Sequence, residues 1–188
     1  MVIPSKTIRE MVSEVIEFTR TYAVWRELMQ PAKANVRGVH QDFLLTVTNA
    51  LVLSFCVGTY QLFDRDTRTK SLIGLIEDIR PSDSVLAQKL TARITADKSV
   101  IERVSRLRNN VYAHRNKLQH PQDVFGAVKL TPRMMKALVQ LAQEVVASLA
   151  VAVGTDTKKD LETEFRRHEN YVLSDTREVL DALEKSGR

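Results

Sequence analysis

Residues 106–120 hold the side chains in this chain that are best suited to chemistry on a phosphate group. The stretch RLRNNVYAHRNKLQH places arginine, asparagine and histidine around a few aliphatic and aromatic residues. A guanidinium binds phosphate oxygens in a fork, and an imidazole titrates near neutral pH and can move protons. These residue types therefore favour binding or cleavage of a phosphate-containing ligand.

The helical periodicity predicts how these groups are arranged. At about 100° per residue, Ile101, Val104 and Arg108 fall on one stripe, which is predicted to face the core. Arg108 then stands where leucine would be expected. His114 lies at the edge of the same face, and Asn110, one turn earlier, can reach and orient its imidazole. Arg103 and Arg106 extend this flank towards the amino-terminal end.

A structural role for Arg108 is the competing interpretation. A guanidinium on a core-facing stripe must be paired, solvated in a cleft or bound to an anion, because an unpaired buried charge is costly. The charged segment DRDTRTK offers Asp64 or Asp66 as a partner for an ion pair. Both interpretations remain open at this stage.

Helical periodicity extends along nearly the whole chain. A first helix is predicted between Ser5 and Pro31, followed by the connector PAKANVRG. The later helices are predicted over about 39–63, 71–79, 83–111, 132–153 and 157–184. Thr131 and Pro132 form an N-cap and first-turn pair, and Gly154 is predicted to stop the helix that they begin. The helix over 39–63 is apolar on most sides and is expected in the middle of a bundle.

These elements predict an all-α fold, an antiparallel helical bundle of four to five long helices plus a short helix. No segment alternates with the period of a strand. Residues 1–188 are expected to form a single domain. The carboxy-terminal helix, about 157–188, has no place in a minimal bundle and is expected to pack on a dimer or on a partner.

The composition narrows the function classes. The net charge of +5 leans towards a polyanionic partner. Cys56 is alone in an apolar run, which excludes an internal disulfide and a cysteine-based zinc cluster and favours a core role. His40 and His168 are interpreted as surface or packing residues. There is no phosphate-cradling glycine loop, zinc-binding histidine pair or GxSxG elbow, so neither a cofactor nor a metal is expected. No membrane span or signal peptide is predicted, which favours a cytoplasmic location.

The segment RNNVYAHR resembles the Rx4-6H motif of the HEPN superfamily, in which a polar residue follows the arginine. Arg108, Asn109 and His114 match this motif, with five residues between Arg108 and His114. The surrounding segments FDRDTRTKSLIGLIEDI and YAHRNK are most similar to the AbiU-type branch of abortive-infection proteins, over about residues 43–149. The family fold is also an antiparallel helical bundle.

A second match to the same pattern follows directly. It consists of Arg115, Asn116 and His120, and His120 precedes Pro121 in a predicted loop. The first match is preferred because it ends a long core helix, as the family motif does.

The resemblance implies a metal-independent endoribonuclease with a composite active site at a homodimer interface, acting as a toxin or phage-defence effector. His114 would act as general base or acid, and Arg108 would stabilise charge on the phosphorus-centred transition state. Asn109 would orient the scissile phosphate or the histidine. The predicted supporting residues are Asn110 and Arg115, and the predicted RNA-binding residues are Arg103, Arg106 and Lys117.

Two alternatives remain beside this hypothesis. The chain would equally suit a non-catalytic HEPN module that dimerises and binds nucleotide, RNA or a partner protein such as an antitoxin. It would also suit a structural bundle in which Arg108 is a paired core ion. Binding and catalysis can use the same arginine and histidine, so the sequence does not separate the first two.

Overall fold

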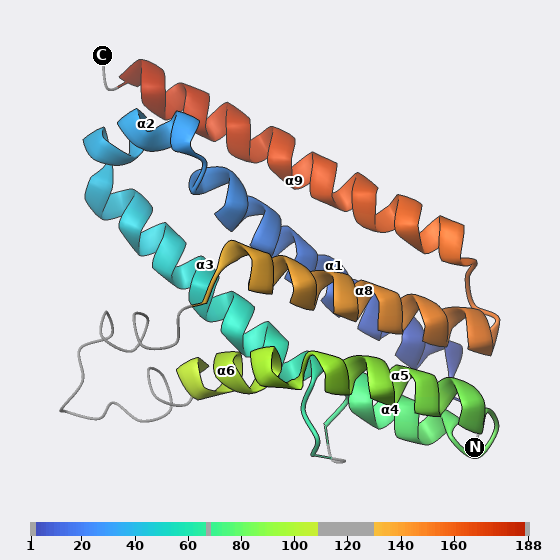
Figure 1. Ribbon diagram of the computed structural model, residues 1–188. Helices are drawn as coiled ribbons and strands as arrows, with labels where there is room; N and C mark the ends of the chain where they lie inside the picture. The colour runs from blue at the N-terminus through green and yellow to red at the C-terminus, as the bar shows by residue number, and fades with distance from the viewer. Residues whose placement is uncertain (1–2, 67–68, 109–129, 187–188) are drawn as a thin grey trace.

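The protein is described by a computed structural model that covers residues 3–66, 69–108 and 130–186. Helices make up nearly all of these residues, and no strand occurs among them (Figure 1). The α-helices, with a 3-10 turn over Pro31–Lys33, are α1 (Ser5–Leu28), α2 (Ala34–Val39), α3 (Gln41–Leu62), α4 (Leu72–Ile79), α5 (Ser84–Ala96), α6 (Lys98–Arg108), α8 (Pro132–Val153) and α9 (Lys158–Ser186). The predicted all-α bundle is confirmed.

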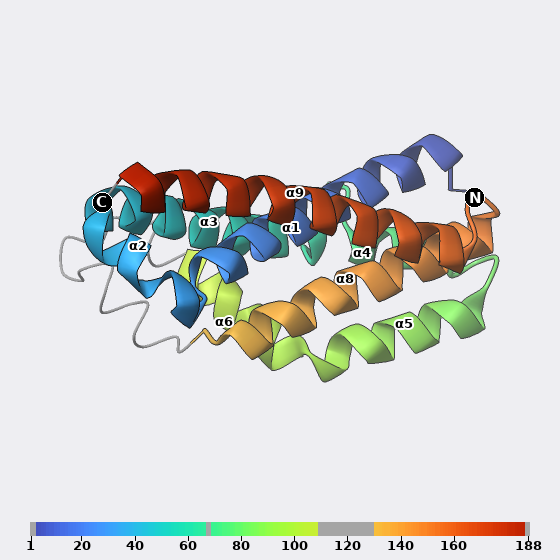
Figure 2. The same cartoon turned by 90° about the horizontal axis from the view of Figure 1, so that it is seen from above.

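Helices α1 and α8 form the centre of the bundle. Helix α1 packs against α3, α8 and α9, and α8 lies between α9 and α5 (Figure 2). Leu138, Ala142, Val145 and Leu149 of α8 are completely buried, at the three- and four-residue spacing of one helical face. The long helices thereby bury their apolar stripes against one another around a single main core.

Local capping chemistry sets several helix boundaries where the sequence predicted them. The Thr131 side chain accepts a hydrogen bond from the Met134 amide, and Pro132 fills the first helical position of α8. Gly154 ends this helix with a φ of 73°, a left-handed conformation that favours glycine. Asp83 caps α5 by accepting a hydrogen bond from the Leu86 amide.

The prediction of one long helix that begins at about residue 83 is wrong, because this part of the chain forms two helices. Helices α5 and α6 are separated at Asp97, whose carboxylate accepts a hydrogen bond from Arg93 at 2.6 Å. Helix α5 packs against α4, whereas α6 packs mainly against α3. A break at Asp97 lets each half direct its apolar side towards its own neighbour, which the periodicity of one segment does not reveal.

Two further predictions differ from the structure. The connector PAKANVRG contains the 3-10 turn and part of α2. Helix α3 does not lie in the middle of the bundle: it packs on α1, α2 and α6, and its outer side stays open, with Phe43 58% exposed. The apolar composition of α3 indicates a tendency to be buried. It does not indicate whether other helices of the same chain bury it.

Helix α9 packs on its own chain. Leu180 near its end joins a second small core with Leu28, Val36 and Leu44, which come from α1, α2 and α3. His40 Nε2 lies 3.1 Å from the Leu183 carbonyl oxygen, to which the imidazole N–H donates. These contacts fix the carboxy-terminal helix against the turn between α1 and α3.

An ion pair between a buried glutamate of α1 and an exposed arginine also holds α9 to α1. Glu27 is only 3% exposed, and its carboxylate accepts hydrogen bonds from Arg177 Nε at 2.9 Å and Nη2 at 3.3 Å. Gln30 donates a further hydrogen bond to it at 2.7 Å. The charge of Glu27 is therefore compensated on more than one side.

Two of the described helices, α3 and α8, are long and apolar enough to cross a membrane by length and composition. Half of the apolar window of α8 is buried inside the bundle, as in the core helix of a soluble protein, against 22% for α3. Such helices are weak evidence for a membrane span. The small buried share of α3 reflects its exposed outer side, on which Phe43 lies.

Candidate functional site

The structure describes the residues that lead into the predicted motif. Helix α6 is described as far as Arg108, the first residue of the motif. The Arg108 side chain lies outside the described part of the chain, as do the other predicted motif and supporting residues and the alternative pair: Asn109, Asn110, His114, Arg115, Lys117 and His120.

Helix α6 turns a slightly different side to the core than the periodicity predicted. Val104 and Leu107 are completely buried, whereas Ile101 is half-buried. The line through Val104 and Leu107 is thus the centre of the buried face. Packing against α3 decides this rotation, and Leu107 is the leucine that fills the core at this level of the helix.

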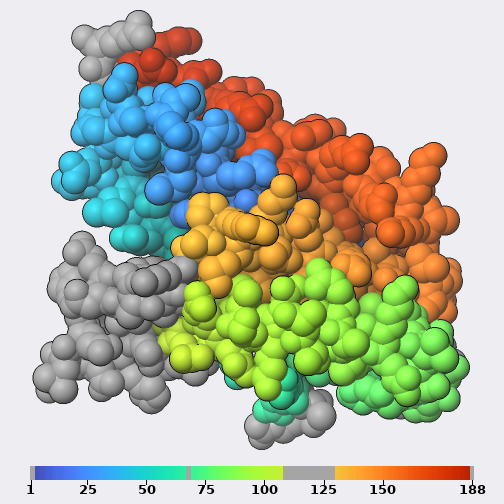
Figure 3. All heavy atoms as spheres, viewed as in Figure 1, coloured from blue at the N-terminus to red at the C-terminus, as the bar shows by residue number. Residues whose placement is uncertain are grey.

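The described end of α6 lies beside the start of α8. Arg103 Nη1 of α6 is 4.0 Å from Met134 Sδ in the first turn of α8. The two helices are neighbours on the face seen in Figure 3. Tyr22 Oη of α1 donates a long hydrogen bond of 3.5 Å to the Pro132 carbonyl, and Leu130 packs against the main core. The first turn of α8 is therefore anchored to both α1 and the middle of α6.

Three cations on the two helices that meet here have no carboxylate partner among the described residues. Arg103 and Arg106 are exposed on α6, and among the described residues neither forms an ion pair. Arg133, exposed in the first turn of α8, likewise has no carboxylate partner in the described part of the chain. The amino-terminal end of α8 adds the partial positive charge of its backbone dipole. This junction suits an anionic ligand.

Sequence reasoning missed Arg133. It recognised the preceding pair, Thr131 and Pro132, as a helix start but gave the next residue no role. The missing information was spatial, because the residue after Arg133, Met134, contacts Arg103 of α6, which lies far away along the chain. A basic residue in the first turn of a helix, where acidic residues are favoured, was the available signal.

A cavity of about 300 Å³ lies beside α6. Tyr60 of α3, Arg65 of the following segment and Lys98 and Ser105 of α6 line it. Lys98 lies 3.6 Å from Glu102, whereas Arg65 is exposed and has no ion-pair partner among the described residues. Ser105 stands three residues before Arg108, so the cavity opens close to the start of the motif.

Asp64, one of the two proposed structural partners of Arg108, takes part in a local turn. Its carboxylate accepts hydrogen bonds from the Asp66 amide at 3.0 Å and from Thr69 Oγ1 at 3.2 Å. Its backbone carbonyl accepts a third from Ser71 Oγ at 2.7 Å. These bonds give Asp64 a structural role that does not require Arg108.

Other catalytic groups are not evident in the described part of the chain. Burial raises the pKa of the Cys56 thiol to about 12, so this cysteine is a core residue and not a nucleophile. Among the described residues, no group of three or more His, Cys, Asp or Glu side chains is arranged to hold a metal ion. His40 and His168 are half-buried and lie on other elements than α6.

An all-α bundle with an Arg-x5-His motif beginning at the end of a core-packed helix is the arrangement of a HEPN-type domain. A comparison with family models supports this class, because the HEPN model described as AbiU2 matches residues 5–172. The chain belongs to this abortive-infection-related AbiU2 family. The match extends beyond the resemblance over 43–149 and includes α1, α2 and the first half of α9. No curated protein and no solved structure matches the chain.

Proposed function

We propose that this protein is a metal-independent endoribonuclease that acts as a toxin or phage-defence effector. The observation that carries the proposal is the position of the Arg-x5-His motif, which starts at the end of α6 in a chain of the HEPN AbiU2 family. The unpaired cations Arg103, Arg106 and Arg133 at the same junction support a polyanionic substrate. Single-stranded RNA fits this charge and the chemistry of the motif.

The proposed chemistry needs no metal. His114 would take the proton of the RNA 2′-hydroxyl or give a proton to the leaving 5′-oxygen. Attack of the 2′-oxygen on phosphorus forms one P–O bond while the bond to the 5′-oxygen breaks. Arg108 would stabilise the negative charge that develops on the phosphoryl oxygens, and Asn109 would orient the phosphate or the imidazole.

A homodimer would complete this site. Base and acid are both required, and two copies related by a two-fold axis would supply a pair of histidines and a pair of arginines. We expect light scattering to give twice the chain mass, and specific activity to fall on dilution below the dimer dissociation constant. A monomer that retains full activity would contradict the composite site.

The decisive experiment compares two histidine variants on labelled single-stranded RNA in EDTA. We expect His114→Ala to lose cleavage by a factor of about 100 or more while its helical circular dichroism is retained. His168→Ala, a half-buried histidine of α9, is the matched control and should cleave like the parent protein. Cleavage that survives His114→Ala, or that requires Mg²⁺, would overturn the proposal.

The same experiment tests the second candidate, a non-catalytic module. The unpaired cations at the junction of α6 and α8 would serve RNA binding equally well. If the parent protein binds RNA in a salt-dependent manner and produces no cleavage products, the binding module replaces the ribonuclease.

A further inference from the structure

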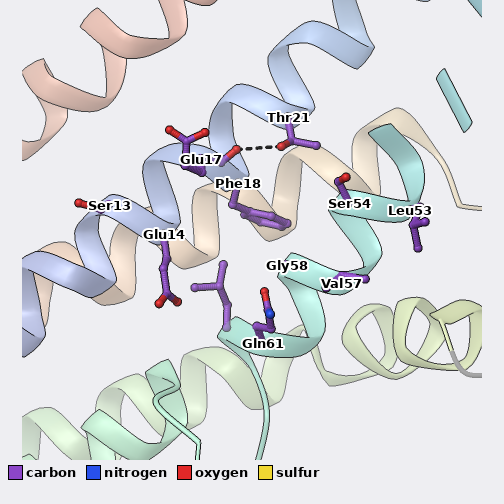
Figure 4. A pocket seen from close by; sticks show the side chains of 11 residues that line it. Ser13, Glu14, Glu17, Phe18, Thr21, Leu53, Ser54, Val57, Gly58 and Gln61 are labelled. Carbon is purple, nitrogen blue, oxygen red and sulfur yellow. Dashed lines mark hydrogen bonds between the residues drawn. The ribbon is translucent and has the colours of Figure 1, made fainter. Parts of the chain in front are cut away.

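A hollow of about 610 Å³ lies between α1 and α3 (Figure 4). Glu14, Phe18 and Thr21 line it from α1, and Leu53, Val57 and Gly58 line it from α3. Phe18 forms its floor, stacked on Phe55 with ring centroids 4.5 Å apart. Gly58 lies close over the ring of Phe18, which is itself buried: an added Cβ would meet its Cδ2 at 3.0 Å.

The outer side of α3 continues this apolar surface. Asp42 is the only charged residue among the 22 of the helix. Phe43, at the amino-terminal end, is mostly exposed, and Leu53 and Val57, at the groove, are half-buried. A helix surface in permanent contact with water normally carries charged side chains, so this side has the composition of a surface that is covered by another molecule.

Glu14 supplies the one charge that enters the groove. Its carboxylate points into the opening between α1 and α3, whereas the carboxylate of Glu17 points away from it (Figure 4). Glu17 is paired with Arg20 at 2.7 Å. Glu14 has no ion-pair partner among the described residues, and Lys70 is itself held by Glu10 at 2.6 Å.

The surroundings of Glu14 favour a visiting cation. Burial raises the pKa of its carboxyl above the ordinary value, and the more distant charge of Lys70 offsets this only in part. A carboxylate beside an apolar surface and without an ion-pair partner gains from a cation brought in by a ligand. The lining of the groove contains no lysine or arginine.

We propose that the α1–α3 groove binds an amphipathic helix of a partner protein, with an aliphatic stripe on Leu53 and Val57 and a lysine or arginine on Glu14. Both walls are helices whose backbone groups are bonded internally, so an occupant must satisfy its own backbone hydrogen bonds, as a helix does. The negative charge of Glu14 would repel an RNA backbone or an anionic membrane. A second copy meeting the groove with its own α3 would bring no cation, because α3 contains none.

The probe is a pair of synthetic helical peptides of about 16 residues, each with a leucine stripe flanked either by lysines or by glutamates. Fluorescence anisotropy with the full-length protein should show binding of the lysine peptide at least about tenfold tighter than that of the glutamate peptide. Glu14→Lys should reverse this preference. Val57→Asp should weaken both peptides by about tenfold or more, because it places a charge in the apolar hollow.

Matched controls exclude general charge effects. Glu178→Lys makes the same charge change at an exposed position of α9 and should leave the peptide preference unchanged. A lysine peptide of scrambled order, without an apolar stripe, should not bind. Circular dichroism establishes that each variant is folded. If Val57→Asp does not fold, the reversed preference of Glu14→Lys still tests the proposal.

Several results would overturn the proposal. Equal binding of the two peptides, binding of the scrambled peptide, or no peptide binding would each refute a helix-binding groove. A dimer that Val57→Asp converts to a monomer would assign the face to a second copy, and Val57-dependent binding to neutral lipid vesicles would assign it to a membrane. RNA cleavage by Glu14→Lys should equal that of the parent, so this proposal and the ribonuclease proposal can fail separately.

Discussion

At the scale of single residues, the contacts of a side chain separate structural roles from chemical ones. Cys56 and Glu27 are both buried, but neither is a candidate for catalysis. The Cys56 thiol has no charged neighbour to stabilise its thiolate, and burial raises its pKa to about 12. Glu27 is bound by Arg177 and Gln30 and joins α1 to α9. In contrast, Arg103, Arg106 and Glu14 carry charges that no described ion pair neutralises.

The Cys56 thiol is predicted to be unreactive in the folded protein. At pH 8 almost none of a thiol with a pKa of about 12 is ionised, and the side chain is completely buried. We expect a thiol-specific reagent to label no cysteine in native protein and one cysteine per chain in denaturant. Rapid labelling of the native protein would show that α3 opens or that the thiol is accessible.

The Glu27–Arg177 pair gives a second residue-scale prediction. Arg177→Ala leaves a buried carboxylate without its main partner, and we expect the Tm to fall by roughly 5 °C. Adding Glu27→Gln should recover part of this loss, because a neutral amide costs less to bury than an unpaired charge. Arg166→Ala, at an exposed arginine of the same helix, should leave the Tm unchanged. A double variant no more stable than Arg177→Ala would disprove this account.

At the scale of helices, packing partners decide where each element ends and which side it buries. The break at Asp97 separates a helix that packs on α4 from one that packs on α3. Helix α9 is held along α1 and closes a small second core at the turn between α1 and α3. The carboxy-terminal helix therefore contributes to the stability of the chain itself.

Two adjacent residues of α9 test this role. Leu180 is 1% exposed and Val179 is 57% exposed. We expect Leu180→Ala to lower the free energy of unfolding by about 2–3 kcal/mol, because it leaves a cavity in the second core. Val179→Ala should change it by less than about 0.5 kcal/mol. Chemical denaturation measures both, and equal effects would show that α9 does not pack as described.

At the scale of the whole molecule, charge and apolar surface are separated. Arginines without an ion-pair partner among the described residues lie on α6 and in the first turn of α8. The outer side of α3 and its groove with α1 are largely free of charge, and Glu14 is the carboxylate that points into the groove (Figure 4). The protein thus offers one surface suited to an anionic polymer and another suited to an apolar, cationic helix.

Salt dependence tests the first of these surfaces. Each lost phosphate contact should reduce the slope of log affinity against log salt by about 0.7 for single-stranded RNA. We therefore expect the double variant Arg103→Gln with Arg106→Gln to bind RNA more weakly and with a slope smaller by about 1.4. Lys89→Gln, at an exposed residue of α5, is the control. An unchanged slope in the double variant would remove these arginines from the RNA surface.

The sequence by itself determined the class of fold and most helix boundaries. Helix formation follows local periodicity and capping, so Thr131, Pro132 and Gly154 could be assigned before their surroundings were known. The Arg-x5-His spacing and the segments around it likewise pointed to the family, because a motif is a property of the chain, and the match of the family model confirms it. The roles of Arg108, Asn109 and His114 remain predictions.

Only the tertiary structure decided which apolar faces are covered and which distant segments are neighbours. The sequence predicted α3 as a central helix, because hydrophobicity measures a tendency to leave water and does not specify the partner. It missed Arg133, because the contact between Met134 and Arg103 joins residues far apart in the chain. Local interactions can be inferred from neighbouring residues, whereas burial and electrostatic pairing depend on how the helices pack.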